Sequence, residues 1–145
     1  MAEIVKYFST EKTKTASILL LEANKFDAKL FKILLKDLKN YNLKITWVKS
    51  KLEAIEQLHN HNFDLIVTHL DTPTTDLPVA LLNARKNKER VVVLTGWEME
   101  NLKVILNLIG VDKFILKSEF DLDYLPKEIG AVLENAEDLR AIQFN

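Results

Sequence analysis

The chain has 145 residues, of which 48% are hydrophobic and 28% are charged, and its formal net charge at pH 7 is −1. This length and composition suit one globular domain with a sizeable core, and the near-neutral charge indicates no general affinity for nucleic acid. Without cysteine, the chain has no disulfide framework and no thiolate chemistry. No apolar run approaches the roughly 20 residues that cross a bilayer, and the polar N-terminus lacks the apolar centre of a secretory signal. We therefore expect a cytoplasmic protein without membrane contact.

The chain alternates short apolar runs with amphipathic segments. Residues 1–16 show no clear period and are expected to form a flexible tail, followed by one domain over 17–140 and a C-terminal tail over 141–145. The apolar runs predict strands at 17–22, 43–48, 64–68, 90–95 and 113–116, and the amphipathic segments predict helices at 25–40, from 50 onward, 74–86, 98–110 and 123–139.

Local signals mark several helix ends. Ser50 and Glu53 form a capping box, Asp76 is the expected N-cap of the third helix with Pro78 in its first turn, and Gly110 is expected to end the fourth. The residues expected to face the core are Phe26, Leu30, Ile33, Leu34 and Leu38 in the first helix, Leu52, Ile55 and Leu58 in the second, Leu102, Ile105, Leu106 and Ile109 in the fourth, and Leu125, Ile129, Val132, Leu133 and Ala136 in the last.

This alternation predicts an α/β fold, a parallel sheet with helices on both faces. The first, third and fourth strands are the most apolar and should be central, whereas 43–48 and 113–116 should be edges. The predicted architecture is a doubly wound (βα)5 three-layer sandwich of flavodoxin-like type, with strand order 2-1-3-4-5. In that order the first and last helices share one face, which places a lysine-rich helix beside an acid-rich one.

Open parallel sheets bind ligands beyond the carboxyl ends of their strands. The side chains expected there are Glu22, Ala23 and Asn24 after the first strand, His69 to Asp71 after the third, Thr95 and Gly96 after the fourth, and Lys117 after the fifth.

Four segments at these positions, in order, resemble one family. They are "SILLLEAN", "FDLIVTHLDTP", "VVVLTG" and "GVDKFILKSEF". Over about residues 16–136 the chain resembles the response-regulator receiver (CheY-like) domain of two-component systems. The resemblance implies a CheY-like fold and the family's chemistry, in which an aspartate at the end of the third strand accepts a phosphoryl group from a histidine kinase. In that reaction Mg²⁺, held partly by an acidic pair, neutralises the transferring oxygens.

The resemblance carries over to only part of the phosphoacceptor pocket. Thr95 and Lys117 stand at the family's hydroxyl and lysine positions, Phe114 at its switch aromatic, and Glu22 at the first position of the acidic pair.

The remaining positions depart from the family pattern. Ala23 occupies the second acidic position, His69 the phosphoacceptor position, and Ser118 the position of a proline that follows a cis peptide bond in the family. We expect a trans bond before Ser118 with some displacement of Lys117, since a cis bond there would cost about 2.5–4 kcal/mol. The sequence therefore predicts a pseudo-receiver without the normal phosphorylation switch, not an enzyme, and one that binds Mg²⁺ poorly.

Alternatives remain for the same residues. His69 is expected to be structural and hydrogen-bonded to Glu22, with Lys117 paired to Glu22 or Asp71. The other readings are an atypical receiver phosphorylated at Asp71 or His69, and a Zn²⁺-like site made by Glu22, His69 and Asp71. Trp97 either covers the pocket or packs at its rim.

The fourth helix carries apolar residues outside its inward stripe. Val104 and Leu108 lie near the opposite side at about 100° per residue. In receivers, the face made by the fourth helix, fifth strand and fifth helix is the usual output and dimer surface. We therefore expect Val104 and Leu108 to contact a protein partner or a second copy of the chain.

Overall fold

The computed structural model describes residues 14–36, 38–98, 100–119, 121 and 123–143. Its strands are β1 (Lys14–Leu21), β2 (Tyr41–Val48), β3 (Leu65–Leu70), β4 (Arg90–Thr95) and β5 (Lys113–Leu116), and its helices are α2 (Lys25–Leu35), α3 (Lys51–Asn60), α4 (Asp76–Ala84), α5 (Glu100–Leu108) and α6 (Tyr124–Gln143), with a 3-10 turn η1 at Lys117–Glu119.

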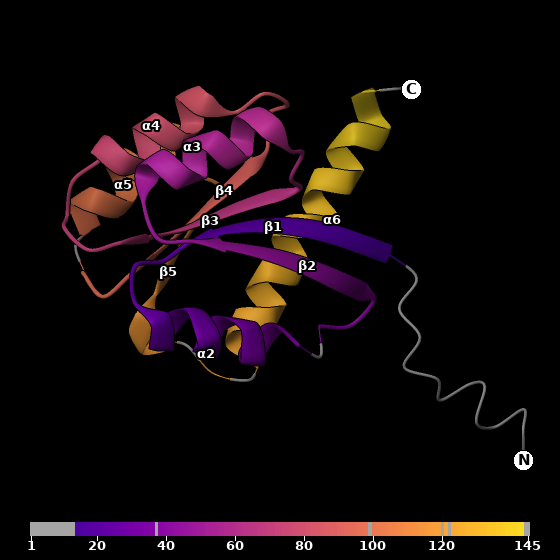
Figure 1. The fold of residues 1–145 in the computed structure, drawn as a ribbon, viewed down its shortest axis with the longest axis horizontal. Coiled ribbons are helices and arrows are strands. Elements are labelled where there is room, and N and C mark those ends of the chain that lie inside the picture. Colours follow the sequence, from indigo (N-terminus) through magenta and orange to yellow (C-terminus); the bar gives the residue numbers. More distant parts are fainter. Residues whose placement is uncertain (1–13, 37, 99, 120, 122, 144–145) are drawn as a thin grey trace, which may run out of the picture.

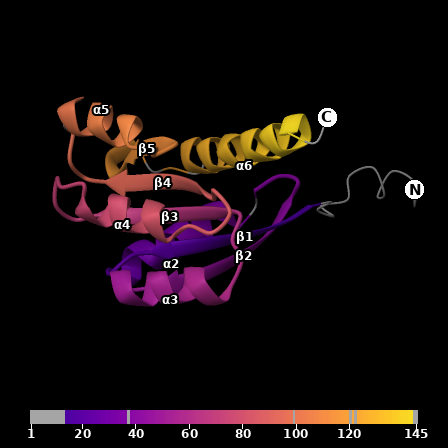
Figure 2. The same cartoon turned by 90° about the horizontal axis from the view of Figure 1, so that it is seen from above.

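The strands of the described residues form one parallel sheet in the order β2-β1-β3-β4-β5, as predicted from the sequence. Figure 2 shows them following one another in this order, with β2 and β5 at the edges. Both edge strands leave side chains partly exposed, whereas β4 is buried from Val91 to Thr95. A strand buried on both faces must be apolar throughout, and for that reason the most apolar runs predicted the central strands.

The core has two parts, one on each face of the sheet. Side chains of α2 and α6 pack on one face with Ile18, Leu20 and Val67. Side chains of α3, α4 and α5 pack on the other face with Leu19 and Ile66. Figure 1 shows α3 and α4 on one side of the strands and α2 on the other. The first and last helices therefore share a face, as predicted, and the fold is a three-layer α/β sandwich.

The helix α2 turns a different side to the sheet than the sequence pattern predicted. Its buried residues are Ala28, Phe31, Leu34 and Leu35. Of the predicted inward residues, Leu34 and Leu38 are buried, but Phe26, Leu30 and Ile33 are 78%, 43% and 63% exposed. The segment carries two apolar stripes on nearly opposite sides at about 100° per residue. Packing against β1 and α6 selects the stripe that contains Phe31.

Two other inward assignments were wrong. Leu52 of α3 and Ile105 of α5 are exposed, while Leu58, Leu102 and Leu106 are buried as predicted. In α3 the buried line runs through Ala54 and Leu58, four residues apart, and Leu52 lies away from it. In α6, Leu125, Ile129, Val132 and Leu133 are buried as predicted, and Ala136 lies outside the described side chains.

Several element boundaries differ from those predicted. β1 begins at Lys14, inside the expected tail of 1–16, because residues 14–16 pair with the start of β2. α2 ends at Leu35, before Asn40 with its positive φ of 70°, and α6 continues to Gln143, into the expected C-terminal tail of 141–145. The end of α5 is as predicted, since Gly110 adopts a φ of 108° that favours glycine.

The helix starts were predicted in part. Ser50 accepts a hydrogen bond from the Glu53 amide at 3.2 Å, which confirms the N-terminal half of the capping box. Thr75, one residue before the predicted Asp76, is the N-cap of α4 and makes no side-chain capping bond. The described peptide bonds include no cis bond, so the bond before Ser118 is trans as predicted.

Candidate functional site

Three of the predicted site residues come together at the carboxyl ends of the strands. Glu22 follows β1, His69 is the penultimate residue of β3, and Lys117 follows β5. The His69 Nδ1 atom lies 2.8 Å from Glu22 Oε2, and Lys117 Nζ lies 3.0 Å from Glu22 Oε1. The predicted contact of His69 with Glu22 is therefore confirmed, and of the two acids considered for Lys117, Glu22 is the one it binds.

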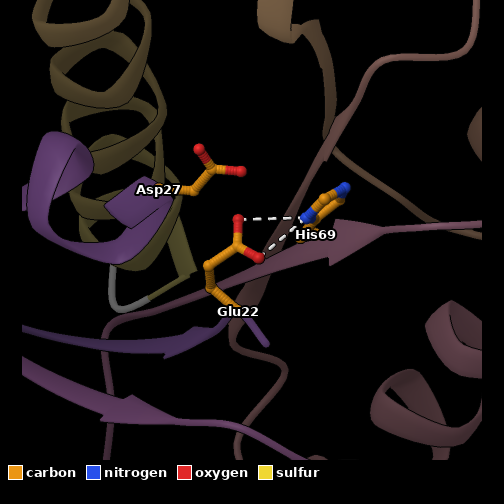
Figure 3. A group of neighbouring side chains, drawn as sticks. All are labelled: Glu22, Asp27 and His69. Atoms are coloured by element: carbon orange, nitrogen blue, oxygen red, sulfur yellow. Dashed lines mark hydrogen bonds and ion pairs between the residues drawn. The ribbon is translucent and has the colours of Figure 1, made fainter. Parts of the chain in front are cut away.

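A fourth residue, Asp27, joins this group without having been predicted. Asn24 caps α2, since its Oδ1 accepts from the amides of Phe26 at 2.9 Å and Asp27 at 3.1 Å. The capped first turn brings the Asp27 carboxylate to Lys117 Nζ, with which it forms an ion pair. Figure 3 shows Asp27 and Glu22 approaching each other, with His69 hydrogen-bonded to Glu22. The only sequence signal was an acidic residue in the first turn of the helix at the predicted crevice.

We call Glu22, Asp27, His69 and Lys117 the ion cluster. Glu22 is its most buried member, with 3% of its side chain exposed, against 13% for His69, 21% for Lys117 and 37% for Asp27. Burial by itself would raise the pKa of the Glu22 carboxyl. The hydrogen bonds from His69, the Asn24 amide and Lys117, with the charge of His69, outweigh burial and hold that pKa below its ordinary value. Glu22 is therefore a carboxylate at neutral pH.

The ring of His69 contacts both a carboxylate and the ammonium group of the cluster. Its Nδ1 atom lies 2.8 Å from Glu22 Oε2 and 2.9 Å from Lys117 Nζ, while its Nε2 lies 3.3 Å from Asp71 Oδ1. A ring nitrogen carries either a proton or a lone pair, so Nδ1 donates to Glu22 or accepts from Lys117, but not both at once. In either state, His69 is held by groups of the chain itself.

Thr95 and Trp97 close the neighbouring side of the crevice. The buried Thr95 hydroxyl donates to the Leu70 carbonyl at 3.0 Å and accepts from the Trp97 amide at 3.1 Å. The Trp97 indole N–H donates to the Asp71 carbonyl at 2.7 Å, although its ring remains partly exposed. Trp97 therefore fastens the loop after β3 to the loop after β4, in the rim position considered for it.

The other predicted site residues lie outside the ion cluster. Ala23 is exposed beside Glu22, and the Asp71 side chain is 71% exposed and reaches only the far nitrogen of His69. Phe114 is half-buried on β5 and lines a cleft of about 510 Å³ between α5, β5 and α6. Val104 and Leu108 are exposed on α5, as predicted.

The ion cluster is also the part of the described chain where metal-ligating atoms converge. Ligand atoms of Glu22, Asp27 and His69 lie within 4.8 Å of one another, with Asp27 in the place that the sequence suggested for Asp71. The Lys117 ammonium contacts all three residues. This set does not fit Mg²⁺, which prefers several hard oxygen ligands in near-octahedral geometry, because an imidazole and a fixed cation occupy part of the ligand shell.

Comparisons with known proteins identify the fold. No protein-family model matches the chain, and no curated protein is significantly similar to it in sequence. Among solved structures, a signal receiver domain from Vibrio parahaemolyticus matches with a TM-score of 0.76 and 23% identity, over 88% of this chain and 97% of that one. A response regulator from Thermotoga maritima matches with a TM-score of 0.72 and 20% identity, over 83% and 98% of the two chains.

A CheY-like receiver domain from Methanospirillum hungatei matches with a TM-score of 0.70 and 20% identity, over 86% of this chain and 98% of that one. These matches span nearly the whole of each solved domain. The chain therefore has the fold of a response-regulator receiver domain, as its sequence motifs suggested. Within the described residues, no helix is long and apolar enough to span a membrane.

Proposed function

We propose that this chain is a pseudo-receiver, a signalling module of the two-component type that acts through contact with partner proteins and catalyses no reaction. The observation that supports this most strongly is the ion cluster. Histidine stands where the family has its phosphoacceptor aspartate, and that histidine is hydrogen-bonded to Glu22. Without a carboxylate at this position, no acyl phosphate can form there.

The charges around His69 support the same proposal. In the family, a lysine and a hydroxyl contact the transferred phosphoryl group. Here the Lys117 ammonium already binds Glu22 and Asp27, and the Thr95 hydroxyl already binds backbone groups of Leu70 and Trp97. A phosphoryl group would have to compete with two carboxylates for Lys117. We therefore propose that Mg²⁺ and phosphoryl analogues bind poorly at this end of the sheet.

The direct test is incubation of the purified chain with acetyl phosphate and Mg²⁺, followed by intact-mass measurement. We expect no phosphoryl adduct, and no saturable change in the amide spectra of Thr95 and Trp97 on titration with beryllofluoride and Mg²⁺. A matched variant, Ala23→Asp with His69→Asp, restores both missing carboxylates and should acquire a Mg²⁺-dependent adduct. A stoichiometric adduct on the unmodified chain would contradict the proposal.

A second candidate is an atypical receiver phosphorylated at Asp71 or His69. One contact favours it, since Asp71 Oδ1 lies 3.3 Å from His69 Nε2 and its side chain is open to solvent. The same mass experiment distinguishes the two candidates. Fragmentation of any adduct would locate it, and an acyl phosphate at Asp71 is distinguished from a phosphohistidine by its lability in base.

We further propose that the protein partner binds the face made by α5, β5 and α6. The cleft on this face is lined by charged residues such as Glu100 and Lys103 as well as by Phe114. Beside it, the outer side of α5 exposes the apolar side chains of Val104 and Leu108. Apolar side chains grouped beside a cleft are typical of interaction sites. The same surface would also serve for a homodimer.

A further inference from the structure

The outer side of β2 carries backbone groups that no described strand pairs with. β2 pairs with β1 alone and forms one edge of the sheet (Figure 2). On the β1 side, the carbonyl of Val48 accepts a hydrogen bond from the Glu22 amide at 3.0 Å. Because backbone groups alternate between the two sides of a strand, the N–H and C=O groups of Leu43, Ile45 and Trp47 point away from β1. They form a row that fits a further strand.

A hollow of about 380 Å³ adjoins this edge on the α2 side of the sheet. Its lining includes the apolar side chains of Leu35, Leu43 and Ile45. Lys32 and Lys36 also line it, and the described residues around it include no Asp or Glu. An added strand would lie about 4.7–4.9 Å from β2. Side chains on its α2 face would therefore reach this hollow and meet an apolar floor bordered by lysines.

A second hollow, of about 230 Å³, adjoins the same edge on the α3 side. Its lining includes Lys44 and Thr46 of β2, Gln57 of α3, and His61 and Asn62 in the segment after α3. Lys44 and His61 are exposed, and again no Asp or Glu is among the described lining residues. The two faces of the edge therefore differ in chemistry, since the α2 face is partly apolar and the α3 face is polar and basic.

The positive charge at this edge is not neutralised by the described carboxylates. The Nζ atoms of Lys32 and Lys49 lie 5.6 Å and 5.2 Å from the centroid of the Trp47 ring. Such cation–π contacts position an ammonium group and leave its charge in place. Within the described part of the chain, no carboxylate forms an ion pair with Lys32, Lys44 or Lys49. A negatively charged ligand would therefore meet no competing acid here.

We propose that an extended segment of a partner protein binds the outer side of β2 as a sixth strand, with alternate apolar residues toward α2 and acidic residues toward α3. In this mode of binding, main-chain hydrogen bonds give affinity, and hollows that take alternate side chains give specificity. The backbone groups of Leu43, Ile45 and Trp47 supply the first, and the two hollows supply the second. This site is separate from the α5 face, and it depends on neither the ion cluster nor the proposed loss of phosphorylation.

Charge and backbone geometry distinguish this occupant from two others. Lysines on an edge strand prevent pairing between identical edges, and a second copy of the chain would bring its own Lys44 and Lys49 against those of the first. A nucleic acid would neutralise the lysines, but it would leave the outward backbone groups of β2 and the apolar floor of the larger hollow without partners. An acidic strand with alternate apolar residues satisfies all three features.

The test uses the full chain and a labelled ten-residue peptide of alternating valine and glutamate. Fluorescence anisotropy should show saturable binding that weakens with added salt. Lys32→Glu with Lys44→Glu should weaken binding at least tenfold. Lys88→Glu with Lys103→Glu alters the net charge equally at exposed lysines outside both hollows and should leave the affinity within threefold. Leu108→Glu should leave it within twofold, which separates this site from the proposed partner surface on α5.

Backbone pairing is tested separately from charge. Only alternate N–H groups of an added strand face its neighbour. N-methylation of one set of peptide residues, the valines or the glutamates, should therefore abolish binding, and N-methylation of the other set should leave it within fivefold. Hydrogen exchange at the amides of Leu43, Ile45 and Trp47 should slow at least tenfold in the complex. Ile45→Pro removes one outward N–H at a position where an edge strand tolerates proline and should weaken binding at least fivefold. Melting curves of all variants report their folding.

The proposal is overturned by any of four results: no saturable binding, equal binding of a valine–lysine peptide, equal effects of the two N-methylated peptides, or unchanged exchange at the three β2 amides. Two further results would assign this edge to another occupant and equally overturn the proposal. One is a dimer in sedimentation that Ile45→Pro dissociates. The other is binding of a ten-nucleotide oligouridylate at least as tight as that of the valine–glutamate peptide.

Discussion

The crevice at the carboxyl ends of the strands and the outer sides of the helices α2 and α5 differ in how far their side chains are already bound within the chain. At the carboxyl ends of the strands, the charged side chains of the ion cluster bind one another, and among the described residues no buried side-chain N or O atom lacks a hydrogen-bond partner. On the outer sides of α2 and α5, by contrast, large apolar side chains are exposed, among them Phe26, Ile33 and Leu108. The charged groups in the crevice where this fold usually binds ligands are therefore paired with one another, whereas the exposed apolar side chains lie on helices.

In the proposed function, the crevice of this receiver fold no longer binds Mg²⁺ or a phosphoryl group, and the exposed helical surfaces bind proteins. Lys117 offsets part of the negative charge of the two carboxylates that it binds, Glu22 and Asp27. The apolar faces require no such compensation, because exposed apolar side chains cost the folded domain little while they remain available to a partner. Four measurements test this contrast between the ion cluster and the exposed helical surfaces.

The largest expected effect separates the two apolar stripes of α2. Phe31→Ala, at a residue 1% exposed, should lower the free energy of unfolding by about 3–5 kcal/mol, because it leaves a cavity in the core. Phe26→Ala removes the same side chain from the exposed side of α2 and should change the free energy of unfolding by less than about 0.5 kcal/mol. Urea denaturation of both variants measures the difference. The opposite order would mean that the stripe containing Phe26 faces the sheet.

The next effect concerns the ion cluster. Lys117→Met leaves the buried Glu22 carboxylate with one partner fewer and should cost about 1–2 kcal/mol, reduced from a fully buried pair because a fifth of Lys117 is exposed. The matched change Lys113→Met breaks a more exposed pair, in which Nζ lies 2.8 Å from Glu128, and should cost less than about 1 kcal/mol. If urea denaturation gave equal losses of unfolding free energy for the two variants, Lys117 would stabilise the fold no more than Lys113 does.

The pH dependence of stability should report Glu22. Because the folded chain lowers the pKa of this carboxyl, its contribution is fully present above the ordinary glutamate pKa. It is lost as the pH falls through the lowered folded-state pKa, since the unfolded chain takes up the proton first. The stability advantage of the unmodified chain over Glu22→Gln should therefore shrink between pH 6 and pH 3, by less than the effect of Lys117→Met. An advantage that stays constant over this range would be inconsistent with a lowered pKa.

The smallest effect on stability is expected on α5. Val104→Glu and Leu108→Glu should change the free energy of unfolding by less than about 0.5 kcal/mol, because both side chains are exposed. They should nevertheless abolish binding of the partner, or self-association, through the α5 face. Sedimentation and pull-down from cell extract measure both, with Ile33→Glu on α2 as the matched control. Unchanged oligomeric state and unchanged partners in both α5 variants would argue against an interface there.

The alternation of apolar runs and amphipathic segments was sufficient to predict the five strands, their order and the shared face of the first and last helices. These features follow from short-range patterns, since a central strand must be apolar on both sides and an edge strand need not be. The pairing of Glu22 with His69 was predictable for a related reason, because parallel strands end at one edge of the sheet and bring their terminal residues together.

Which stripe of α2 is buried, and which acid joins Lys117, depends on packing between distant segments of the chain. Phe26 and Phe31 are equally apolar, and helical periodicity does not say which one faces the sheet; packing against β1 and α6 does. Asp27 enters the ion cluster because Asn24 caps α2 at the mouth of the crevice, 90 residues away from Lys117 in the chain. A sequence pattern records local preference, whereas the partner of a charge or an apolar face is set by whichever distant segment the fold places beside it.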